Sequence, residues 1–369
     1  MKSSIKRVLI YRLGSLGDTV VALPALHLVA RAYPEADRWL LTNFPVQVKA
    51  PPAAAILEGT GLVHGYFRYT VGTRSPLALL ALWWQLVLWR PEVLVYMGPP
   101  RGVDAARRDA RFFRLCGIRQ LMGVPLTEEM QENLVAADGM LEQEAARLTR
   151  NLAELGNARL EDSASWDLQL TSLERARADE ALRPVGERRF LAVSIGTKVQ
   201  TNDWGRENWR VLLAGIARRF PGYALAITGS AIDTEYSEAI AEGWREGAAA
   251  SGGGPVGTVC PVVNLCGVLT PRESAAVFAR ASLFLGHDSG PMHLAAAVQT
   301  PCVAIFSARG KPRVWFPHGS EHRVLYHPVN CWGCGLETCI VERKKCILSI
   351  TVEEVLTQVC AVLGEAAVR

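Results

Sequence analysis

The feature that most constrains this chain is its alternation of short apolar runs, loops of small residues and stretches with helical spacing. Residues 7–11 form a β-rich run and the loop 12–18 follows it. Apolar residues then recur with the spacing of a helix, which Pro24 either opens or kinks. Strands that alternate with helices are typical of parallel βαβ units. The sequence therefore predicts an α/β fold built on parallel sheets.

The alternation occurs in two halves of the chain. The strands expected in the first half are 7–11, 39–42, 63–66, 93–96 and 120–123. Those expected in the second half are 190–195, 223–228, 282–286 and, last, 302–306. Residues 157–188 are charged and lack the alternation, so we place the linker there. A length of 369 residues fits two domains, expected at about 1–170 and 171–345.

The last segment, residues 346–369, is expected to form a helix. Thr351 and Glu354 have the spacing of a capping box, as do Thr270 and Glu273 earlier in the chain. Apolar residues then lie on one helical face, at positions 352, 355, 356, 359, 360 and 363. Because a lone amphipathic helix must bury that face, we expect this helix to return to the first domain.

Composition and charge exclude several classes of protein. Lys and Arg exceed Asp and Glu by 40 − 36 = +4, which is too little to indicate nucleic-acid binding. Nine cysteines are too few for a disulfide scaffold of this length. No apolar stretch of signal-peptide length follows the N-terminus, so we expect a cytoplasmic protein.

Residues 76–89 are strongly apolar but too short to span a membrane, which takes about 20 apolar residues. They predict either a buried core helix or a helix at a membrane surface. Trp83, Trp84 and Trp89 favour the second alternative, because Trp prefers the membrane–water interface.

The loop 12–18, Arg-Leu-Gly-Ser-Leu-Gly-Asp, is the first functional candidate. Gly14 and Gly17 permit a tight turn and a close approach to a ligand, and Arg12 and Ser15 belong to the same loop. The glycine spacing lacks the dinucleotide fingerprint, and there is no Walker lysine. Asp18 is either a helix cap or a general base at the carboxyl ends of the strands.

A second candidate is the start of a helix at residues 289–293. Ser289 and Gly290 can offer N–H groups to a phosphate, because a helix N-terminus attracts anions, and His293 lies one turn inside. Asp288 either caps this helix or contacts a group such as a ribose.

Two further loops in the second half suit the same anion. Thr197 and Lys198 follow its first strand, and Gly229 and Ser230 follow the next. A phosphate clamp in one half and a carboxylate in the other suit transfer from a nucleotide-activated donor.

Residues 12–26, Arg-Leu-Gly-Ser-Leu-Gly-Asp-Thr-Val-Val-Ala-Leu-Pro-Ala-Leu, and 287–296, His-Asp-Ser-Gly-Pro-Met-His-Leu-Ala-Ala, resemble the heptosyltransferases of glycosyltransferase family 9. The resemblance covers nearly the whole chain. It implies a GT-B fold, in which two Rossmann-like domains face each other across a cleft. It also implies inverting, metal-independent transfer of a heptose or related sugar from an ADP-sugar to a lipopolysaccharide core or similar glycan.

The resemblance also implies roles for individual residues. Asp18 matches the general base, and Thr197 matches a hydroxyl in the donor phosphate loop. The donor loop itself is matched by Asp288, Ser289, Gly290 and His293. The family's phosphate-binding lysine is replaced here by Asn202, and Lys198 is expected to substitute for it. Asp233, rather than Glu235, is preferred as the acidic residue near the nucleotide ribose.

Four cysteines lie close together in the sequence: Cys331, Cys334, Cys339 and Cys346. Such spacing can hold a structural zinc or iron ion, as in the related autotransporter heptosyltransferases. The alternative is reduced or partly paired thiols in an ordered loop. No cofactor is expected to be required for catalysis.

Two other functions are kept open. One is a nucleotide-sugar epimerase on the same fold, and the other is a metal-dependent assembly protein or autotransporter-type protein heptosyltransferase built around the cysteines. A lipid-linked glycan acceptor would bring the enzyme to the inner membrane as a peripheral protein, with residues 76–89 as the contact.

Overall fold

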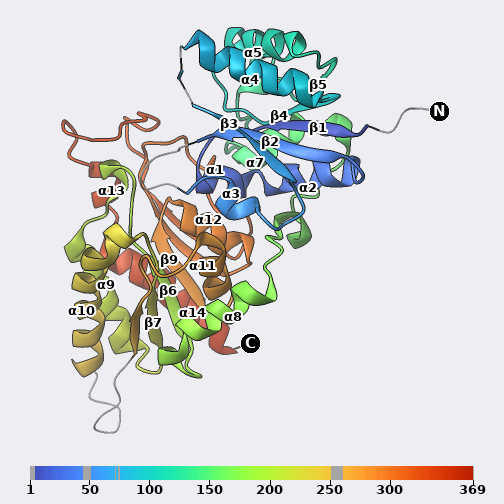
Figure 1. Cartoon of the computed structure of the whole chain (residues 1–369). Helices are drawn as coiled ribbons and strands as arrows, with labels where there is room; N and C mark the ends of the chain where they lie inside the picture. Colours follow the sequence, from blue (N-terminus) through green and yellow to red (C-terminus); the bar gives the residue numbers. More distant parts are fainter. Residues whose placement is uncertain (1–4, 45–50, 71, 74, 251–260, 369) are drawn as a thin grey trace. The chain divides into compact units, whose positions relative to one another are not determined.

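The computed structural model describes residues 5–44, 51–70, 72–73, 75–250 and 261–368. The chain folds as two compact units, Met1–Gln169 and Leu170–Arg369, and both are α/β (Figure 1). The break lies inside the region 157–188 where a linker was expected. That region is more ordered than a linker, because it contains helix α8 (Ser172–Ala181), which packs against α11 (Pro271–Phe278) of the second unit.

Unit 1 contains a five-stranded parallel sheet in the order β3-β2-β1-β4-β5. The strands are β1 (Arg7–Tyr11), β2 (Asp37–Asn43), β3 (Gly65–Tyr69), β4 (Val93–Tyr96) and β5 (Gln120–Met122). All five strands expected for this half are confirmed, although β3 begins two residues later than predicted. The central strand β1 is buried from Val8 to Tyr11, as expected for a strand covered on both faces.

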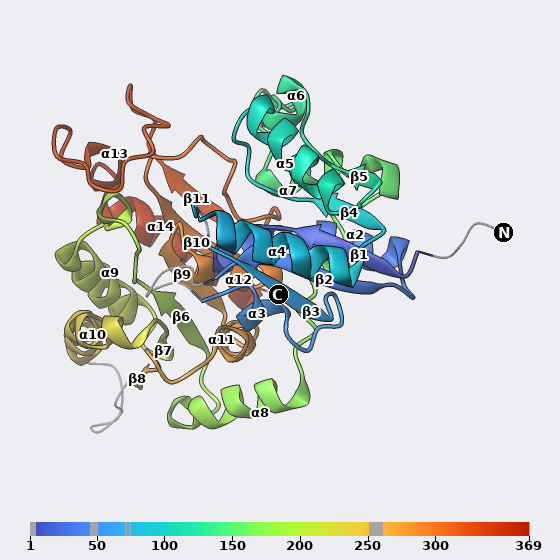
Figure 2. The same ribbon diagram turned by 45° about the horizontal axis from the view of Figure 1, so that its top comes forward.

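The helices of unit 1 are α1 (Leu16–Val21), α2 (Leu23–Ala32), α3 (Ala54–Leu57), α4 (Pro76–Trp89), α5 (Val103–Leu115), α6 (Glu128–Gln131) and α7 (Glu144–Arg150). Pro24 lies in the first turn of α2, so it opens a new helix rather than kinking a continuous one. Helices α4 and α5 lie side by side on one face of the sheet (Figures 1 and 2). Their inner residues Leu82, Leu86 and Phe113 share a core with Leu9 and Leu94 of the strands.

Unit 2 contains a six-stranded parallel sheet in the order β11-β10-β9-β6-β7-β8. Its strands are β6 (Phe190–Ser194), β7 (Ala224–Ile227), β8 (Val262–Asn264), β9 (Leu283–His287), β10 (Cys302–Phe306) and β11 (Arg323–Tyr326). The four strands predicted for this half are confirmed. The prediction that 302–306 is the last strand is wrong, because β11 follows it. Strands β8 and β11 escaped the sequence analysis because they are short, half-buried edge strands without a continuous apolar run.

The other helices of unit 2 are α9 (Arg206–Arg219), α10 (Thr234–Ala250), α12 (Gly290–Ala297), α13 (Lys345–Leu348) and α14 (Val352–Val368). Both predicted capping boxes form, since the N–H groups of Glu273 and Glu354 bond to the hydroxyls of Thr270 and Thr351. Among the described residues, no helix is both long and apolar enough to cross a membrane.

Helix α14 packs on unit 2. Its apolar stripe includes Val355, Leu356 and Val359, which are buried in one core with Leu212 of α9 and Ile305 of β10. The expectation that this stripe returns to the first domain is therefore wrong. The apolar periodicity correctly identified a face to be buried, but periodicity carries no information about which sheet covers it.

Two glycines let α9 and α10 approach closely. A Cβ atom at Gly243 would lie 2.2 Å from the Arg210 carbonyl oxygen, and one at Gly247 would lie 2.2 Å from the Ala214 carbonyl oxygen. Both oxygens belong to the backbone of α9 and cannot move without the helix. The separation of these two helices therefore depends on glycine at both positions.

We predict that Gly247→Ala lowers the free energy of unfolding by about 1–3 kcal/mol, the usual cost of overpacking. The matched control is Gly364→Ala in α14, where a Cβ meets nothing within 4 Å. That variant should gain roughly 0.5–1 kcal/mol from helix propensity. Denaturant unfolding of both variants measures the difference, and equal effects would contradict the close packing.

Candidate functional site

Both sheets reverse their strand order at a defined point. In unit 1 the chain runs from β1 to β2 and β3 on one side and then crosses to β4 on the other side of β1. In unit 2 it runs from β6 to β7 and β8 and then crosses to β9. Loops leave the carboxyl ends of such strands in opposite directions, and ligands of open α/β sheets bind in the crevice between them. The predicted site loops follow β1, β6 and β9, so they lie at these two switch points.

Asp18 is the third residue of α1, and one of its oxygens caps the helix. Asp18 Oδ2 accepts hydrogen bonds from the Ser15 N–H (2.8 Å) and the Ser15 hydroxyl (3.1 Å). Asp18 Oδ1 lies 3.9 Å from an Arg12 nitrogen, and 33% of the side chain is exposed. Asp18 therefore does cap the helix, but the cap uses only one carboxylate oxygen. The carboxylate also remains in contact with solvent.

Residue 14 must be a glycine because the Asp18 side chain lies directly against it. Its φ angle is +141°, and a Cβ atom there would lie 2.3 Å from the Asp18 Cβ. Its N–H donates to Asn43 Oδ1 (2.6 Å), which ties the loop to the end of β2. Gly17, the other predicted loop glycine, lies inside the first turn of α1. Asn43 was not predicted as a site residue. The one sequence feature that could have indicated it is its position at the end of a strand.

Arg12 is buried and donates to backbone carbonyl groups of two loops. Its Nε and Nη2 atoms donate to the Asp18 carbonyl oxygen (3.2 and 2.9 Å), and Nη1 donates to the Met97 carbonyl oxygen (2.9 Å). Met97 directly follows β4. One guanidinium thus connects the loops on both sides of the unit 1 switch point.

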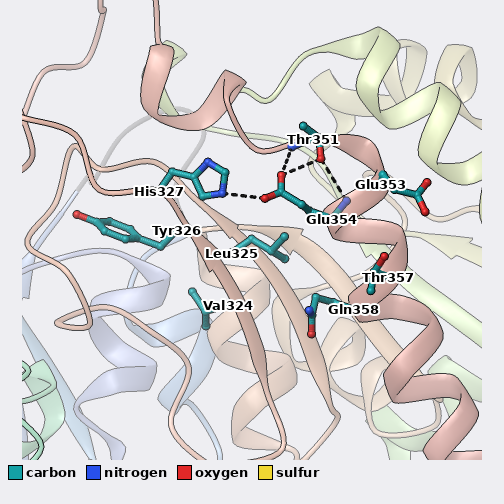
Figure 3. A pocket seen from close by; sticks show the side chains of 9 residues that line it. All are labelled: Val324, Leu325, Tyr326, His327, Thr351, Glu353, Glu354, Thr357 and Gln358. Carbon is teal, nitrogen blue, oxygen red and sulfur yellow. Dashed lines mark hydrogen bonds and ion pairs between the residues drawn. The ribbon is translucent and has the colours of Figure 1, made fainter.

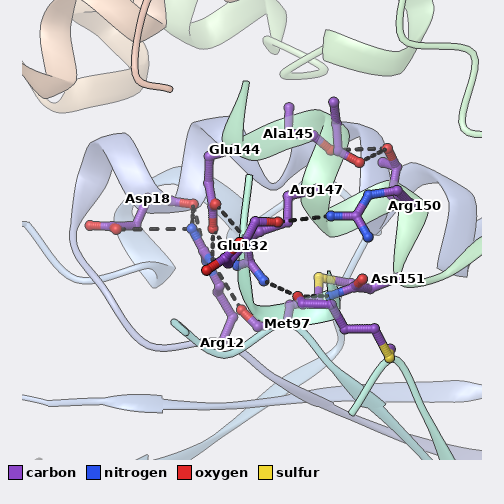
Figure 4. A network of polar contacts seen from close by, with 12 residues as sticks. Arg12, Asp18, Met97, Glu132, Glu144, Ala145, Arg147, Arg150 and Asn151 are labelled. Carbon is purple, nitrogen blue, oxygen red and sulfur yellow. Dashed lines mark hydrogen bonds and ion pairs between the residues drawn. The ribbon is translucent and has the colours of Figure 1, made fainter. Parts of the chain in front are cut away.

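A buried acidic and basic pair supports Arg12 (Figure 4). Glu144 Oε1 lies 3.6 Å from Arg12 Nη1. The same carboxylate accepts two hydrogen bonds from Arg147, at 2.8 and 2.7 Å, in a bidentate pair. Both residues come from α7 and are almost fully buried. Sequence analysis missed them, because nothing in the spacing of residues 144–147 indicates burial.

In unit 2 the loops after β6 and β7 meet at Asp233. A Cβ atom at Gly196 would lie 2.5 Å from Asp233 Oδ2, and one at Gly229 would lie 3.3 Å from the Asp233 Cβ. Asp233 Oδ2 also accepts from the N–H and hydroxyl of Ser230, at 3.0 and 2.5 Å. The structure thus brings the predicted residues Gly229, Ser230 and Asp233 together. Glu235 lies beyond them, exposed in the first turn of α10.

Thr197 and Lys198 lie in the loop after β6. The Thr197 hydroxyl donates to the Val199 carbonyl oxygen (3.0 Å), and Lys198 is exposed. Ser194 pairs with Gly286 across β6 and β9, so this loop leaves the sheet beside the loop after β9. Both loops therefore emerge at the same edge of the sheet.

The start of α12 has the features expected of an anion site. Ser289, not Asp288, occupies the N-cap position, and its side chain makes no cap hydrogen bond. The Ser289 hydroxyl donates instead to the His287 carbonyl oxygen (3.2 Å). The alternative in which Asp288 caps this helix is therefore wrong. His293 is nearly buried, with its ring 6.2 Å from that of Trp315.

Asn202 is a buried structural link. Its amide nitrogen donates to the Asp288 carbonyl oxygen (3.2 Å), and its oxygen accepts from the Ser307 hydroxyl (2.5 Å). These contacts tie the loop after β9 to the end of β10. The Asn202 amide therefore has a structural role in holding these two segments together.

His287 is buried at the end of β9. Its Nε2 accepts from the Trp204 N–H and from Trp209 Nε1, both at 3.3 Å. Burial lowers the pKa of His287 to about 4, so the ring is neutral at pH 7. This histidine acts as a neutral acceptor that fixes the strand end immediately before Asp288.

The four clustered cysteines are not grouped as metal ligands in the described part of the chain. All are free thiols, and Cys339 Sγ accepts the Lys344 N–H (3.4 Å). Within the described part of the chain, which includes all four, no three His, Cys, Asp or Glu side chains are grouped closely enough to hold a metal ion. The zinc or iron alternative thus does not fit the arrangement of these residues.

A pocket of about 450 Å³ lies apart from the predicted site residues (Figure 3). It is formed by the end of β11 and the start of α14. His327 Nε2 lies 3.1 Å from Glu354 Oε1, and Thr351 donates to Glu354 from both its N–H and its hydroxyl (2.7 Å each). The bonds from Thr351 lower the pKa of Glu354. The sequence analysis did not anticipate this pocket.

Residues 139–345 match glycosyltransferase family 9 (heptosyltransferase). A segment of 98 residues is 35% identical to lipooligosaccharide heptosyltransferase 2 of Campylobacter jejuni and covers 26% of this chain and 30% of that relative. The chain thus matches less than a third of the length of this curated relative.

Two solved structures share the fold. A family 9 glycosyltransferase from Veillonella parvula superposes with a TM-score of 0.67 at 16% identity, covering 99% of both chains. The E. coli heptosyltransferase WaaC with ADP-2-deoxy-2-fluoro heptose superposes with a TM-score of 0.59 at 18% identity, covering 96% of this chain and 98% of that one. These matches confirm the predicted fold class, an α/β protein of the GT-B type.

We predict that Arg147→Met destabilises the protein by roughly 3–5 kcal/mol, because it leaves Glu144 buried without its bidentate partner. The matched control is Arg107→Met, which removes an exposed pair with Asp104 at the same spacing. That change should cost less than about 1 kcal/mol. Denaturant unfolding separates the two, and a small effect at Arg147 would contradict the role of the buried network.

Proposed function

This chain belongs to glycosyltransferase family 9, and from that premise we propose that it is an inverting glycosyltransferase. The proposed donor is an ADP-heptose or related ADP-sugar, and the proposed acceptor is a lipopolysaccharide core or similar lipid-linked glycan. The observation that carries this proposal is the position of the predicted loops. The carboxylate of Asp18 lies at the switch point of one unit and the start of α12 at that of the other.

Unit 2 is proposed to hold the donor. The N–H groups at the start of α12 and the positive end of its dipole suit a diphosphate. Lys198 is exposed in the neighbouring loop and supplies a mobile positive charge. Thr197 precedes Lys198, Asp288 and His293 lie at the start of α12, and Gly229 and Ser230 lie in the loop after β7. Asp233 is the proposed contact for the ribose.

Asp18 is proposed to be the general base. An acceptor hydroxyl has too high a pKa to attack unaided, so a carboxylate must take its proton as the new bond forms. The oxygen attacks the anomeric carbon from the face opposite the leaving group, and the bond from that carbon to the ADP oxygen breaks. The electron pair leaves on the diphosphate, which Lys198 and the α12 start stabilise.

No cofactor is needed in this scheme, because side chains and helix N–H groups supply both the base and the positive charge. We propose that the protein acts in the cytoplasm, peripherally at the inner membrane where a lipid-linked acceptor is found. Its relative in Campylobacter jejuni is named a lipooligosaccharide heptosyltransferase, and WaaC was solved with an ADP-heptose analogue. These names support the choice of donor and acceptor class.

We predict that Asp18→Asn lowers kcat by about 10²–10⁴, the usual contribution of a general base. The amide oxygen can still accept from the Ser15 N–H, so the cap and the fold should survive. Glu273→Gln, which alters an equivalent capping box on α11, is the control and should keep kcat. Steady-state transfer from ADP-heptose and thermal unfolding test this, and near-normal turnover of Asp18→Asn would leave Asp18 as a cap alone.

We predict that Lys198→Ala weakens ADP binding by about tenfold, because a charge-assisted contact to phosphate is worth on the order of 1.4 kcal/mol or more. Lys345→Ala is the control, since that lysine is exposed and pairs with Glu342 on α13. Calorimetric titration with ADP gives both affinities. Unchanged binding by the Lys198 variant would remove this lysine from the clamp.

A further inference from the structure

Helix α4 presents an apolar stripe that the fold of unit 1 does not cover. Leu77, Leu80, Trp84 and Leu88 are spaced along one side of the helix, and they are 55 to 78% exposed. The residues that α4 buries are Leu82 and Leu86, on the other side. The helix contains no charged residue over its 14 positions. An exposed stripe of this kind indicates a surface that another body covers.

The tryptophans of α4 divide between the two sides. Trp84 is exposed, whereas Trp83 donates its ring N–H to the Leu115 carbonyl oxygen (3.0 Å). Trp89 packs against Trp39 and Phe67, with ring centroids 5.4 Å from each. Of the three tryptophans predicted to contact a membrane, Trp84 alone points outward, and the other two fasten the helix to unit 1.

Helix α5 places positive charge beside the stripe. It lies next to α4 on the same face of the sheet (Figure 2), and Leu115 at its end is 73% exposed. Its exposed side carries four arginines, namely Arg107, Arg108, Arg111 and Arg114. With Asp104 and Asp109 included, α5 has a net charge of 4 − 2 = +2. Asp109 is paired with Arg101, so it faces away from the arginine row.

We propose that the outer faces of α4 and α5 dock unit 1 onto an anionic lipid bilayer. The apolar stripe with Trp84 would enter the interfacial region, and the arginines of α5 would contact the anionic headgroups. Helix α4 is too short to span a bilayer, so it lies along the surface. A second copy of the chain is a poorer occupant, because a two-fold contact would bring two rows of arginines together.

This inference deepens the proposed function, on which its link to a lipid-linked acceptor rests. Docking by α4 and α5 would hold the domain that carries Asp18 at the surface where such an acceptor is anchored. Binding to vesicles itself requires neither donor nor transfer. A failure of the docking surface and a failure of the proposed reaction can therefore be told apart.

The test is flotation of the full chain with vesicles of phosphatidylethanolamine and phosphatidylglycerol, compared with phosphatidylcholine alone. The wild type should bind the anionic vesicles, and high salt should weaken that binding. Leu80→Glu with Trp84→Glu, and separately Arg108→Gln with Arg111→Gln and Arg114→Gln, should each reduce it by about tenfold or more. The matched control is Leu173→Glu with Ile340→Glu, which alters two exposed apolar residues of unit 2 and should bind as the wild type.

Thermal unfolding checks that each variant is folded, and transfer to a detergent-soluble acceptor fragment should be unchanged in all of them. Absence of wild-type binding to anionic vesicles, or equal binding by the α4 variant, would overturn the proposal. So would a lipid-free dimer of the wild type that the α4 variant abolishes in sedimentation analysis, since the stripe would then belong to a second copy. Vesicle binding without any transfer from ADP-heptose would instead retain the docking surface and reject the proposed reaction.

Discussion

The arrangement of unit 1 depends on one buried guanidinium. Arg12 donates to the carbonyl oxygens of Asp18 and Met97, which follow different strands, and the Glu144 carboxylate lies beside Arg12 while it pairs with Arg147. Carbonyl groups at the ends of parallel strands must be satisfied or solvated, and a planar fork with several donors can serve two loops at once. These contacts fix the position of the Asp18 carboxylate. Arg12 bonds to the backbone carbonyl oxygen of Asp18, and Ser15 bonds to its side chain.

In unit 2 a neutral amide, that of Asn202, bonds to a carbonyl group of the loop after a strand. Asn202 donates to the Asp288 carbonyl oxygen and accepts from Ser307, so it joins the loops after β9 and β10. Its neutrality leaves the positive potential at the start of α12 to Lys198 and the helix itself. A buried arginine at this place would attract the anion to itself, whereas an amide positions the loop without competing for a phosphate.

Local sequence pattern was sufficient to predict most strands of the fold. Features that depend on contacts between residues far apart in the sequence could not be predicted from it. Strands β1, β4 and β10 were predicted to the residue, and the order of strand, loop and helix over residues 7–26 placed the Asp18 carboxylate at a helix start. The partner of α14, the burial of Arg12 and the role of Asn202 were not predictable. Each depends on residues far away in sequence, such as Ser307, which lies 105 positions from Asn202. Periodicity reports which face is buried but not what buries it.

The carboxylates of Asp18 in unit 1 and Asp233 in unit 2 each lie against a glycine. In unit 1 a Cβ at Gly14 would strike Asp18, and in unit 2 a Cβ at Gly196 would strike Asp233. Each carboxylate accepts hydrogen bonds from a serine three residues before it through one oxygen. In each unit the glycine therefore leaves room for the carboxylate, which is fixed through one oxygen. That combination suits a group that must receive a sugar hydroxyl, as a base at Asp18 and as a ribose contact at Asp233.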